Sequence, residues 1–205
     1  MRNAFVNTLT ELARNDDNVF LVTADMGFSV FEDFREEFPD RFLNTGIAEQ
    51  NTIGIAAGLA MSGKVVYVYS IIPFITMRCF EQIRLDLAYN NANVKLVGVG
   101  AGFTYGSMGS SHHAIEDISI MRSIPNMTVL CPGDPFETEE LIKRSYEKNG
   151  PVYIRLGKNG EPTIHKNKNK IKIGELITIT TGNDLILITT SNTLELAKSW
   201  VDEWN

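Results

Sequence analysis

The sequence has few of the residues that mark secreted, metal-binding or nucleic-acid-binding proteins. Its only two cysteines, Cys79 and Cys131, lie far apart in a chain of 205 residues, and they match no disulfide framework and no zinc-ligand spacing. Basic residues are outnumbered, since 19 Lys and Arg stand against 25 Asp and Glu, for a net charge of −6. Nucleic acid requires clustered Lys and Arg, so the composition argues against it as a partner.

Long hydrophobic runs are also missing. No segment approaches the roughly 20 apolar residues of a membrane helix. Residues 1–15 show the spacing of an amphipathic helix and lack the apolar core of a secretion signal. The sequence therefore predicts a cytoplasmic protein with no membrane partner.

Short runs rich in β-branched residues alternate with longer segments of helical spacing. The predicted buried strands cover residues 19–25, 64–70, 93–100, 127–134 and 151–157. The predicted helices between them cover residues 48–61, 74–90, 114–124 and 135–148. This alternation predicts an α/β fold, with a mostly parallel sheet flanked by helices on both faces and an active site at the C-terminal ends of the strands.

The composition changes after the last of these strands. Residues 161–172 are polar and basic and are predicted to form a linker. Residues 173–205 contain runs that predict a strand or hairpin, a further strand and a final helix. Because so few elements cannot close a core, we expect a first domain over residues 1–160 and, after the linker, the beginning of a truncated α/β domain.

The stretch GIAEQNTIGIAAGLA, residues 46–60, places the carboxylate of Glu49 among small and apolar residues. Gly54 and Gly58 share one helical face, which permits close approach of another helix or a bound ring, while Ile47 and its apolar neighbours are expected in the core. An acid in the first turn of a helix is favoured by the helix dipole whether it is solvated or holds a ligand. The residues alone leave both possibilities open.

Two further segments offer candidate site residues. In PFITMRCFEQIR, residues 73–84, Phe74 and Phe80 can form an apolar wall, although aromatic stripes on helices usually belong to the core. The adjacent His112 and His113 lack a third ligand, so they do not predict a metal site. From the residues alone, His112 is an exposed or hydrogen-bonded loop histidine.

Charged residues follow two of the predicted strands. Asp25 ends the strand over residues 19–25, where a capping acid is the simpler interpretation. Arg155 and Lys158 lie at the end of the strand over residues 151–157 and are either solvated or available to an anionic substrate.

Three segments together resemble the pyrimidine-binding domain of the transketolase family of thiamine diphosphate enzymes. They are FLNTGIAEQNTIGIAAGLAMSG, SIIPFITMRCFEQIRLDLAYN and GSMGSSHHAIEDISIMRSIPNMTVLCPGDP. Their order and spacing match the family over about residues 1–160, and the tail from Ile171 resembles the opening of the family's third domain.

The resemblance implies cofactor-binding roles. Glu49 matches the family's glutamate that holds the N1′ nitrogen of the cofactor's aminopyrimidine, where a delivered proton favours the imino tautomer that then removes the thiazolium C2 proton. Phe74 and Phe80 match aromatic positions beside the pyrimidine ring, and Met77 and Arg78 are weaker candidates. The family also has an acid at the place of Asp25.

The resemblance also implies substrate-binding roles. His112 matches the histidine of the family's GPTHQ loop, with serines at 110 and 111 in place of proline and threonine. Lys158 stands where relatives carry an arginine for the sugar phosphate, with Arg155 as a second candidate. The resemblance implies a transketolase subunit that transfers a two-carbon ketol unit between sugar phosphates. Met108, however, replaces the acid of sugar-handling relatives. Three alternatives therefore remain: a 2-oxo acid dehydrogenase β-type subunit, a deoxyxylulose phosphate synthase fragment and a non-catalytic partner chain.

The family's motif for the cofactor diphosphate is missing from this chain. Relatives bind the diphosphate and Mg²⁺ through GDG followed by about thirty residues and NN, a set of oxygen ligands that suits Mg²⁺. We therefore expect a partner, the N-terminal subunit of a split transketolase, to supply that motif. We also expect self-association into a homodimer or heterotetramer, because glycine-rich faces and exposed apolar segments favour it.

Overall fold

A computed structural model describes residues 1–158, 160–165 and 171–204, and within them it contains one six-stranded sheet. All neighbouring strands are parallel, in the order β2-β1-β3-β4-β6-β5. The strands are β1 (Val19–Thr23), β2 (Phe42–Asn44), β3 (Val65–Ile71), β4 (Val94–Val99), β5 (Thr128–Leu130) and β6 (Val152–Leu156). The five predicted strands are all present.

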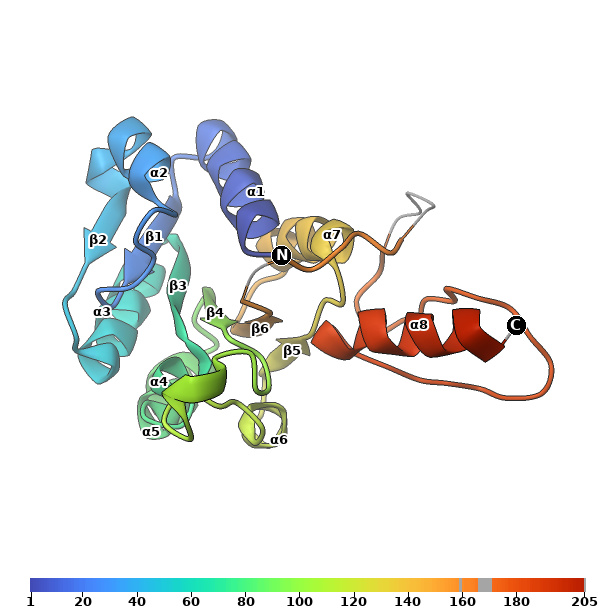
Figure 1. The fold of residues 1–205 in the computed structure, drawn as a ribbon. Coiled ribbons are helices and arrows are strands. Elements are labelled where there is room, and N and C mark those ends of the chain that lie inside the picture. Colours follow the sequence, from blue (N-terminus) through green and yellow to red (C-terminus); the bar gives the residue numbers. More distant parts are fainter. Residues whose placement is uncertain (159, 166–170, 205) are drawn as a thin grey trace.

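Helices cover both faces of the sheet (Figure 1), which confirms the predicted fold class. One face packs against α1 (Arg2–Asn15), α2 (Glu32–Glu37) and α7 (Pro135–Glu147). The other packs against α3 (Glu49–Met61), α4 (Ile72–Ile75), α5 (Phe80–Gln82), the π-helix η2 (Ile83–Tyr89) and α6 (Asp117–Arg122). No described helix has both the length and the apolar character needed to cross a membrane.

The sequence explains why these elements form. Every residue of β4 and β6 is buried, as expected for central strands covered on both faces. Helix α7 begins where Asp134 caps it, because an Asp134 side-chain oxygen accepts from the Glu137 N–H at 2.7 Å and Pro135 fills the first helical position.

The predicted continuous helix over residues 74–90 is wrong. The structure breaks it into α4, a turn over residues 76–79, α5 and η2. At the break, both the N–H and the hydroxyl of Thr76 donate to the carbonyl of Ile72, at 2.9 and 2.6 Å, so this residue ends α4. The turn leaves Phe74 half-buried and Arg78 exposed at the surface.

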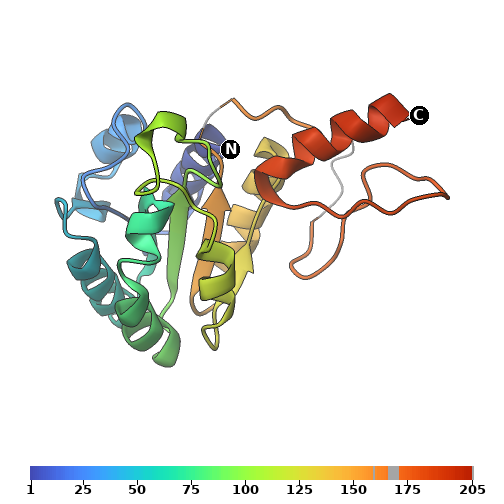
Figure 2. The same cartoon turned by 60° about the horizontal axis from the view of Figure 1, so that its bottom comes forward.

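The predicted strands of the tail are wrong for the described residues 171–190, which form no strand. A strand needs a neighbour for its backbone groups, and isolated strand pairs are marginal in water. The predicted final helix is present as α8 (Leu194–Trp204), preceded by the 3₁₀ turn η4 (Ser191–Thr193), and extends away from the sheet (Figure 2). Residues 166–170 of the predicted linker lie outside the described residues, and the domain boundaries remain predictions.

Candidate functional site

The candidate site lies where the strands of the sheet end. Asp25 follows β1, Phe74 follows β3, and Lys158 follows β6. The segment after β2 leads directly into Glu49 at the start of α3. This is the edge of a parallel sheet at which α/β proteins bind their ligands.

Glu49 is buried and ion-paired. It is the first residue of α3, it is only 4% exposed, and one of its carboxylate oxygens lies 2.9 Å from an Nη of Arg78. The positive end of the α3 dipole and the guanidinium both lie next to this carboxylate and are favourable neighbours for an acidic side chain. A freely solvated first-turn acid therefore does not describe this residue.

The surface of α3 beside Glu49 is open. Ile47, just before α3, is 79% exposed, so the expectation that it lies in the core is wrong, whereas Ile53 of α3 is fully buried. Gly54 and Gly58 are exposed, and a Cβ added at either would meet no atom within 4 Å. The smooth face predicted from the two glycines therefore faces outward, where another helix or chain can approach.

Arg78 connects Glu49 to a row of rings. Its guanidinium carbon lies 4.3 Å from the centre of the Phe74 ring, close enough for a cation–π contact. The ring centre of His112 lies 5.0 Å from that of Phe74 in an edge-on arrangement. His112 therefore contacts the same Phe74 ring as Arg78, and Arg78 is the ion-pair partner of Glu49.

The row continues to Lys158. Tyr105 lies on the other side of His112, with ring centres 5.4 Å apart, and the Lys158 ammonium lies 4.9 Å from the centre of the tyrosine ring. We refer to Glu49, Arg78, Phe74, His112, Tyr105 and Lys158 as the site row. It brings together five of the residues singled out from the sequence, Arg78 being the weaker candidate among them, from segments between residues 49 and 158.

The loop that carries His112 is held by its own hydrogen bonds. The His112 Nδ1 lies 2.9 Å from the hydroxyl of Ser111, and the His113 Nε2 lies 3.0 Å from the carbonyl of Gly106. His113 thus folds the loop, while His112 faces the rings. Met108 on the same loop is 60% exposed, so this loop presents an apolar side chain at the surface.

Asp25 lies outside the row and shapes the segment before Glu49. One of its oxygens accepts from the Asn44 amide nitrogen at 3.1 Å, and its own N–H donates to the Asn44 side-chain oxygen at 2.9 Å. The same Asn44 oxygen accepts from the Gly46 N–H at 3.0 Å. Asp25, at φ +52°, therefore helps to fix the turn that leads into α3.

Phe80 and Arg155 also lie apart from the row. Phe80 is half-buried and packs against the apolar core between α3, η2 and the sheet. Arg155 is 6% exposed and donates to Asp117, Ser191 and the carbonyl of Ala114. Because these internal partners occupy its guanidinium, the structure does not support the expected substrate contact by Arg155.

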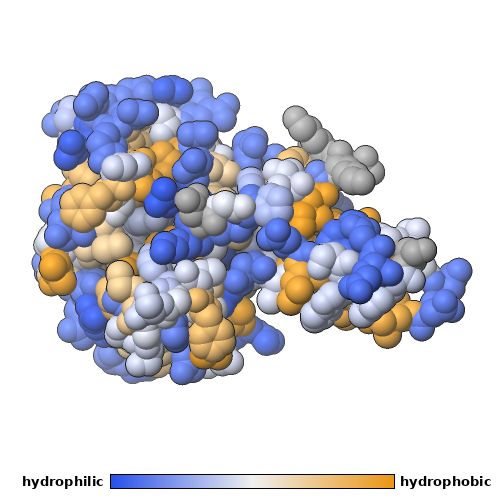
Figure 3. Space-filling view, viewed as in Figure 1, coloured by the Kyte–Doolittle hydropathy of each residue, from blue (hydrophilic) through white to orange (hydrophobic). Residues whose placement is uncertain are grey.

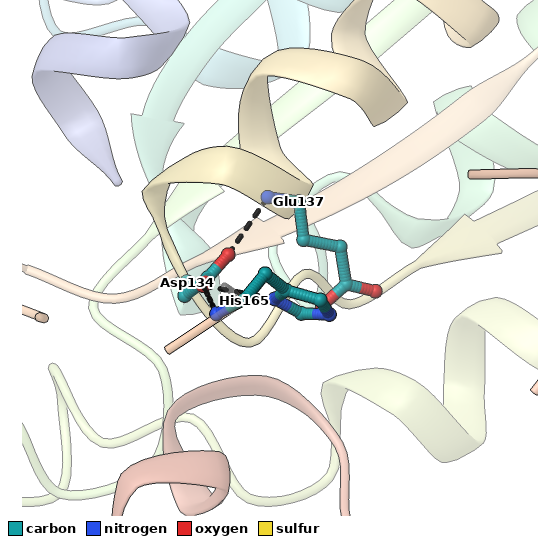
Figure 4. Close-up of side chains that lie close together, drawn as sticks. All are labelled: Asp134, Glu137 and His165. Carbon is teal, nitrogen blue, oxygen red and sulfur yellow. Dashed lines mark hydrogen bonds and ion pairs between the residues drawn. The ribbon is translucent and has the colours of Figure 1, made fainter. Parts of the chain in front are cut away.

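Asp134, Glu137 and His165 form a cluster of the type that can hold a metal ion (Figure 4). One Asp134 oxygen accepts from the N–H groups of Ile164 and His165 and from the His165 imidazole, all within 2.9 Å, and the other accepts from the Glu137 N–H. A carboxylate committed to four N–H donors has little left for a cation. The geometry describes a clasp that attaches residues 164–165 to the start of α7.

Sequence reasoning undervalued two members of the row. Arg78 was only a weak candidate, although a cation within an aromatic segment was the available signal for a partner of Glu49. Tyr105 was not singled out, and nothing in GAGFTYGS marks it, because its contacts with His112 and Lys158 depend on how this loop folds and how it packs against the segment after β6.

Comparison with known proteins is consistent with this geometry. The family described as the transketolase pyrimidine-binding domain matches residues 1–162. An apulose-4-phosphate transketolase subunit of Phocaeicola vulgatus is 40% identical over 195 residues, which cover 94% of this chain and 62% of that protein. A 6-deoxy-6-sulfo-D-fructose transketolase subunit of Clostridium sp. strain MSTE9 is 36% identical, over 93% of this chain and 59% of that protein.

A solved structure described as a split gene transketolase, inactive beta4 tetramer, superposes with a TM-score of 0.80 at 38% identity, over 89% of this chain and 59% of that one. This chain thus spans about three fifths of the length of these relatives. The family match extends over the whole sheet and every member of the site row, and on that basis the chain belongs to the family of transketolase pyrimidine-binding domains.

Proposed function

We propose that this chain is the pyrimidine-binding part of a split transketolase, which transfers a two-carbon ketol unit between sugar phosphates with thiamine diphosphate. The observation that carries the proposal is the buried carboxylate of Glu49 at the start of α3, paired with Arg78, whose guanidinium lies over the Phe74 ring. A buried acid that shares a neighbour with an aromatic face is a chemically suitable site for a flat heterocycle with a basic ring nitrogen.

The site row fits the aminopyrimidine of the cofactor. Glu49 would hold a proton at the ring nitrogen N1′, and Phe74 would support the face of the ring. Arg78, the present partner of Glu49, is 45% exposed and can turn toward solvent. When bound, thiamine diphosphate supplies the carbon nucleophile that accepts the ketol unit.

The other members of the row suit the substrate. His112 lies between two aromatic rings and is half-buried, which orients its imidazole to exchange a proton with an oxygen of the sugar. Lys158 is exposed at the far end of the row, where its ammonium can pair with an anionic group. In this proposal, proton transfer at His112 and anion binding at Lys158 take place at different positions along the row.

We propose a substrate with an anionic end, either a phosphate or a sulfonate. Lys158 supports this from the structure, because an ammonium is a good partner for either group. Two relatives are named for apulose 4-phosphate and for 6-deoxy-6-sulfo-D-fructose, each of which carries such a group. The exposed Met108 on the His112 loop favours a sugar with fewer hydroxyl groups to recognise at that point.

We propose that the diphosphate and its Mg²⁺ are bound by a separate N-terminal subunit that carries the GDG and NN motifs. One relative is named as a subunit and another as a product of a split gene. Hydrophobic side chains are visible at the surface of the sheet-bearing body and of the tail (Figure 3), and Ile47 and Phe103 are 79% and 66% exposed. Exposed apolar surface of this kind supports burial against a partner and a second copy.

A matched pair of variants tests the proposal. Glu49→Gln, combined with the N-terminal subunit, thiamine diphosphate and Mg²⁺, should lower ketol transfer by about 10²- to 10⁴-fold, the range for loss of a positioned proton-transfer group. Glu81→Gln, which changes an exposed acid on α5 that pairs with Arg84, should leave the rate unchanged. Equal rates for Glu49→Gln and the unaltered chain would overturn the proposal.

A further inference from the structure

Arg155 forms a buried junction between β6, the start of α6 and the tail. Its Nε donates to an Asp117 oxygen at 2.9 Å, and the same oxygen accepts from the Tyr153 hydroxyl at 2.6 Å. Asp117 and Tyr153 are fully buried and Arg155 nearly so. Such a pair is costly to bury and is sensitive to the loss of any one partner.

This junction lies under the base of the loop that carries His112. Gly102 and Ala114 close that loop by exchanging two backbone hydrogen bonds of 3.0 Å. An Nη of Arg155 donates to the carbonyl of Ala114 at 2.9 Å, two residues from His112. The guanidinium therefore holds one end of the loop directly.

The tail reaches the same junction. Ser191 is 1% exposed, and its hydroxyl accepts from the other Nη of Arg155 at 2.8 Å, with the Asn192 side-chain oxygen at 3.4 Å. The Asn192 amide nitrogen donates to the carbonyl of Ala101 at 3.5 Å, next to the other end of the loop. The Ser191 N–H donates to the carbonyl of Cys131 after β5, which fixes the turn in place.

From these contacts we propose that Ser191 and Asn192 of the tail are positioning residues for the His112 loop, residues 102–114, acting through Arg155. The tail orients the guanidinium, the guanidinium holds Ala114, and the held loop keeps His112 between Phe74 and Tyr105. Among the residues that the structure describes, one oxygen of Asp117 has no hydrogen-bond partner, and the other accepts a single hydrogen bond from the guanidinium, so the guanidinium's remaining contacts come from the loop and the tail. The catalytic consequence rests on the proposed function, whereas the order of the loop does not.

The test uses the full chain with the double variant Ser191→Ala/Asn192→Ala, because these small changes preserve the buried charge pair. Amide hydrogen exchange over residues 102–114 should become faster by about tenfold, since the hydrogen bonds that hold the loop are lost. Exchange in α1 and α7 should not change. The His112 imidazole resonances should also move, because the ring would leave its contacts with Phe74 and Tyr105.

Thr193→Ala is the matched control. The Thr193 hydroxyl bonds Thr190 and Thr189 within the same turn, so its loss should leave exchange over residues 102–114 as in the unaltered chain. If the double variant exchanges no faster than Thr193→Ala over these residues, the positioning role is refuted. This outcome is independent of the Glu49→Gln result, because neither exchange nor the imidazole spectrum requires turnover.

Discussion

Glu49 and Arg78 form an ion pair between the start of α3 and the turn over residues 76–79, with 2.9 Å between a carboxylate oxygen and an Nη nitrogen. The acid is 4% exposed, while the arginine is 45% exposed and also lies over the Phe74 ring. The pair therefore joins a buried anion to a partly exposed cation at the surface. In this arrangement the charge of Glu49 is satisfied within the chain, and the proposed cofactor contact requires the arginine to turn toward solvent.

A double-mutant cycle should measure this pair. Glu49→Gln, Arg78→Gln and the double variant should give a coupling energy of about 1 to 3 kcal/mol in urea unfolding, because a hydrogen bond to a buried charged group is worth more than an exposed one. The same cycle on Glu81 and Arg84, which are both more than half exposed, should give about 0.2 to 1 kcal/mol. Similar coupling energies in the two cycles would contradict the burial argument.

The two phenylalanines of the aromatic segment should behave differently. Phe74→Leu should weaken thiamine diphosphate binding by up to about tenfold, because ring stacking contributes about 0.5 to 1.5 kcal/mol, with a small effect on the stability of the chain. Phe80→Leu should mainly lower the urea midpoint, because Phe80 packs against the apolar core. Calorimetry of cofactor binding in the complex and urea unfolding of the chain separate the two effects.

The strands that sequence analysis found are those with strong local signals. The runs that became β1, β3, β4 and β6 are continuous and β-branched, and they are buried on both faces. Strand β2 was missed because its three residues, Phe-Leu-Asn, include no β-branched side chain, whereas β5, which is equally short and at the other edge of the sheet, contains Thr128 and Val129. The tail runs carry the same local signal without a neighbouring strand, which shows that pairing partners decide the outcome.

For the site, the residue types could be predicted from sequence and their partners could not. Glu49, Phe74, His112 and Lys158 were marked by motif, and the structure places them in one row. The partner of Glu49 depends on the break at Thr76, which places Arg78 beside α3. Arg155 follows a strand just as Lys158 does, but its contacts with Asp117 and Ser191 depend on how the tail docks.

The clasp of Asp134 and His165 should make stability depend on pH. Burial acts to raise the pKa of Asp134, but hydrogen bonds from the His165 imidazole and from backbone N–H groups outweigh it and lower the pKa to about 2. The hydrogen bond to Asp134 raises the pKa of His165 above its ordinary value, against burial. The stability that Asp134 contributes is lost as pH falls from its ordinary pKa of 3.8 toward 2. The stability that His165 contributes is lost as pH rises through its raised pKa. The clasp therefore stabilises most between about pH 4 and 6.5.

Unfolding of the His165→Gln variant measures this contribution. The variant should be less stable than the unaltered chain by about 1 kcal/mol at pH 5.5, and the difference should shrink by pH 8.5. Thr138→Ala is the control, because the Thr138 hydroxyl donates to the backbone carbonyl of Asp134 and carries no ionisable group, so its effect on stability should not change with pH. A difference that stays constant from pH 5.5 to 8.5 would show that the His165 imidazole is not protonated in the clasp.

Lys158 should decide how tightly an anionic substrate is held. Lys158→Gln should raise the KM for a sugar phosphate by about tenfold or more, because the ammonium ion pair with the phosphate is lost, and should change kcat little, since Lys158 lies at the far end of the row from Glu49. Lys172→Gln, which changes an exposed lysine paired with Glu175 in the tail, should leave KM unchanged. A sugar without a phosphate should show the same KM with either variant and with the unaltered chain. An equal rise in KM for the sugar without a phosphate and for the sugar phosphate would contradict this prediction. Lys158 would then act by holding the loop of residues 102–114 through its contact with the Tyr105 ring, and not by binding the anion.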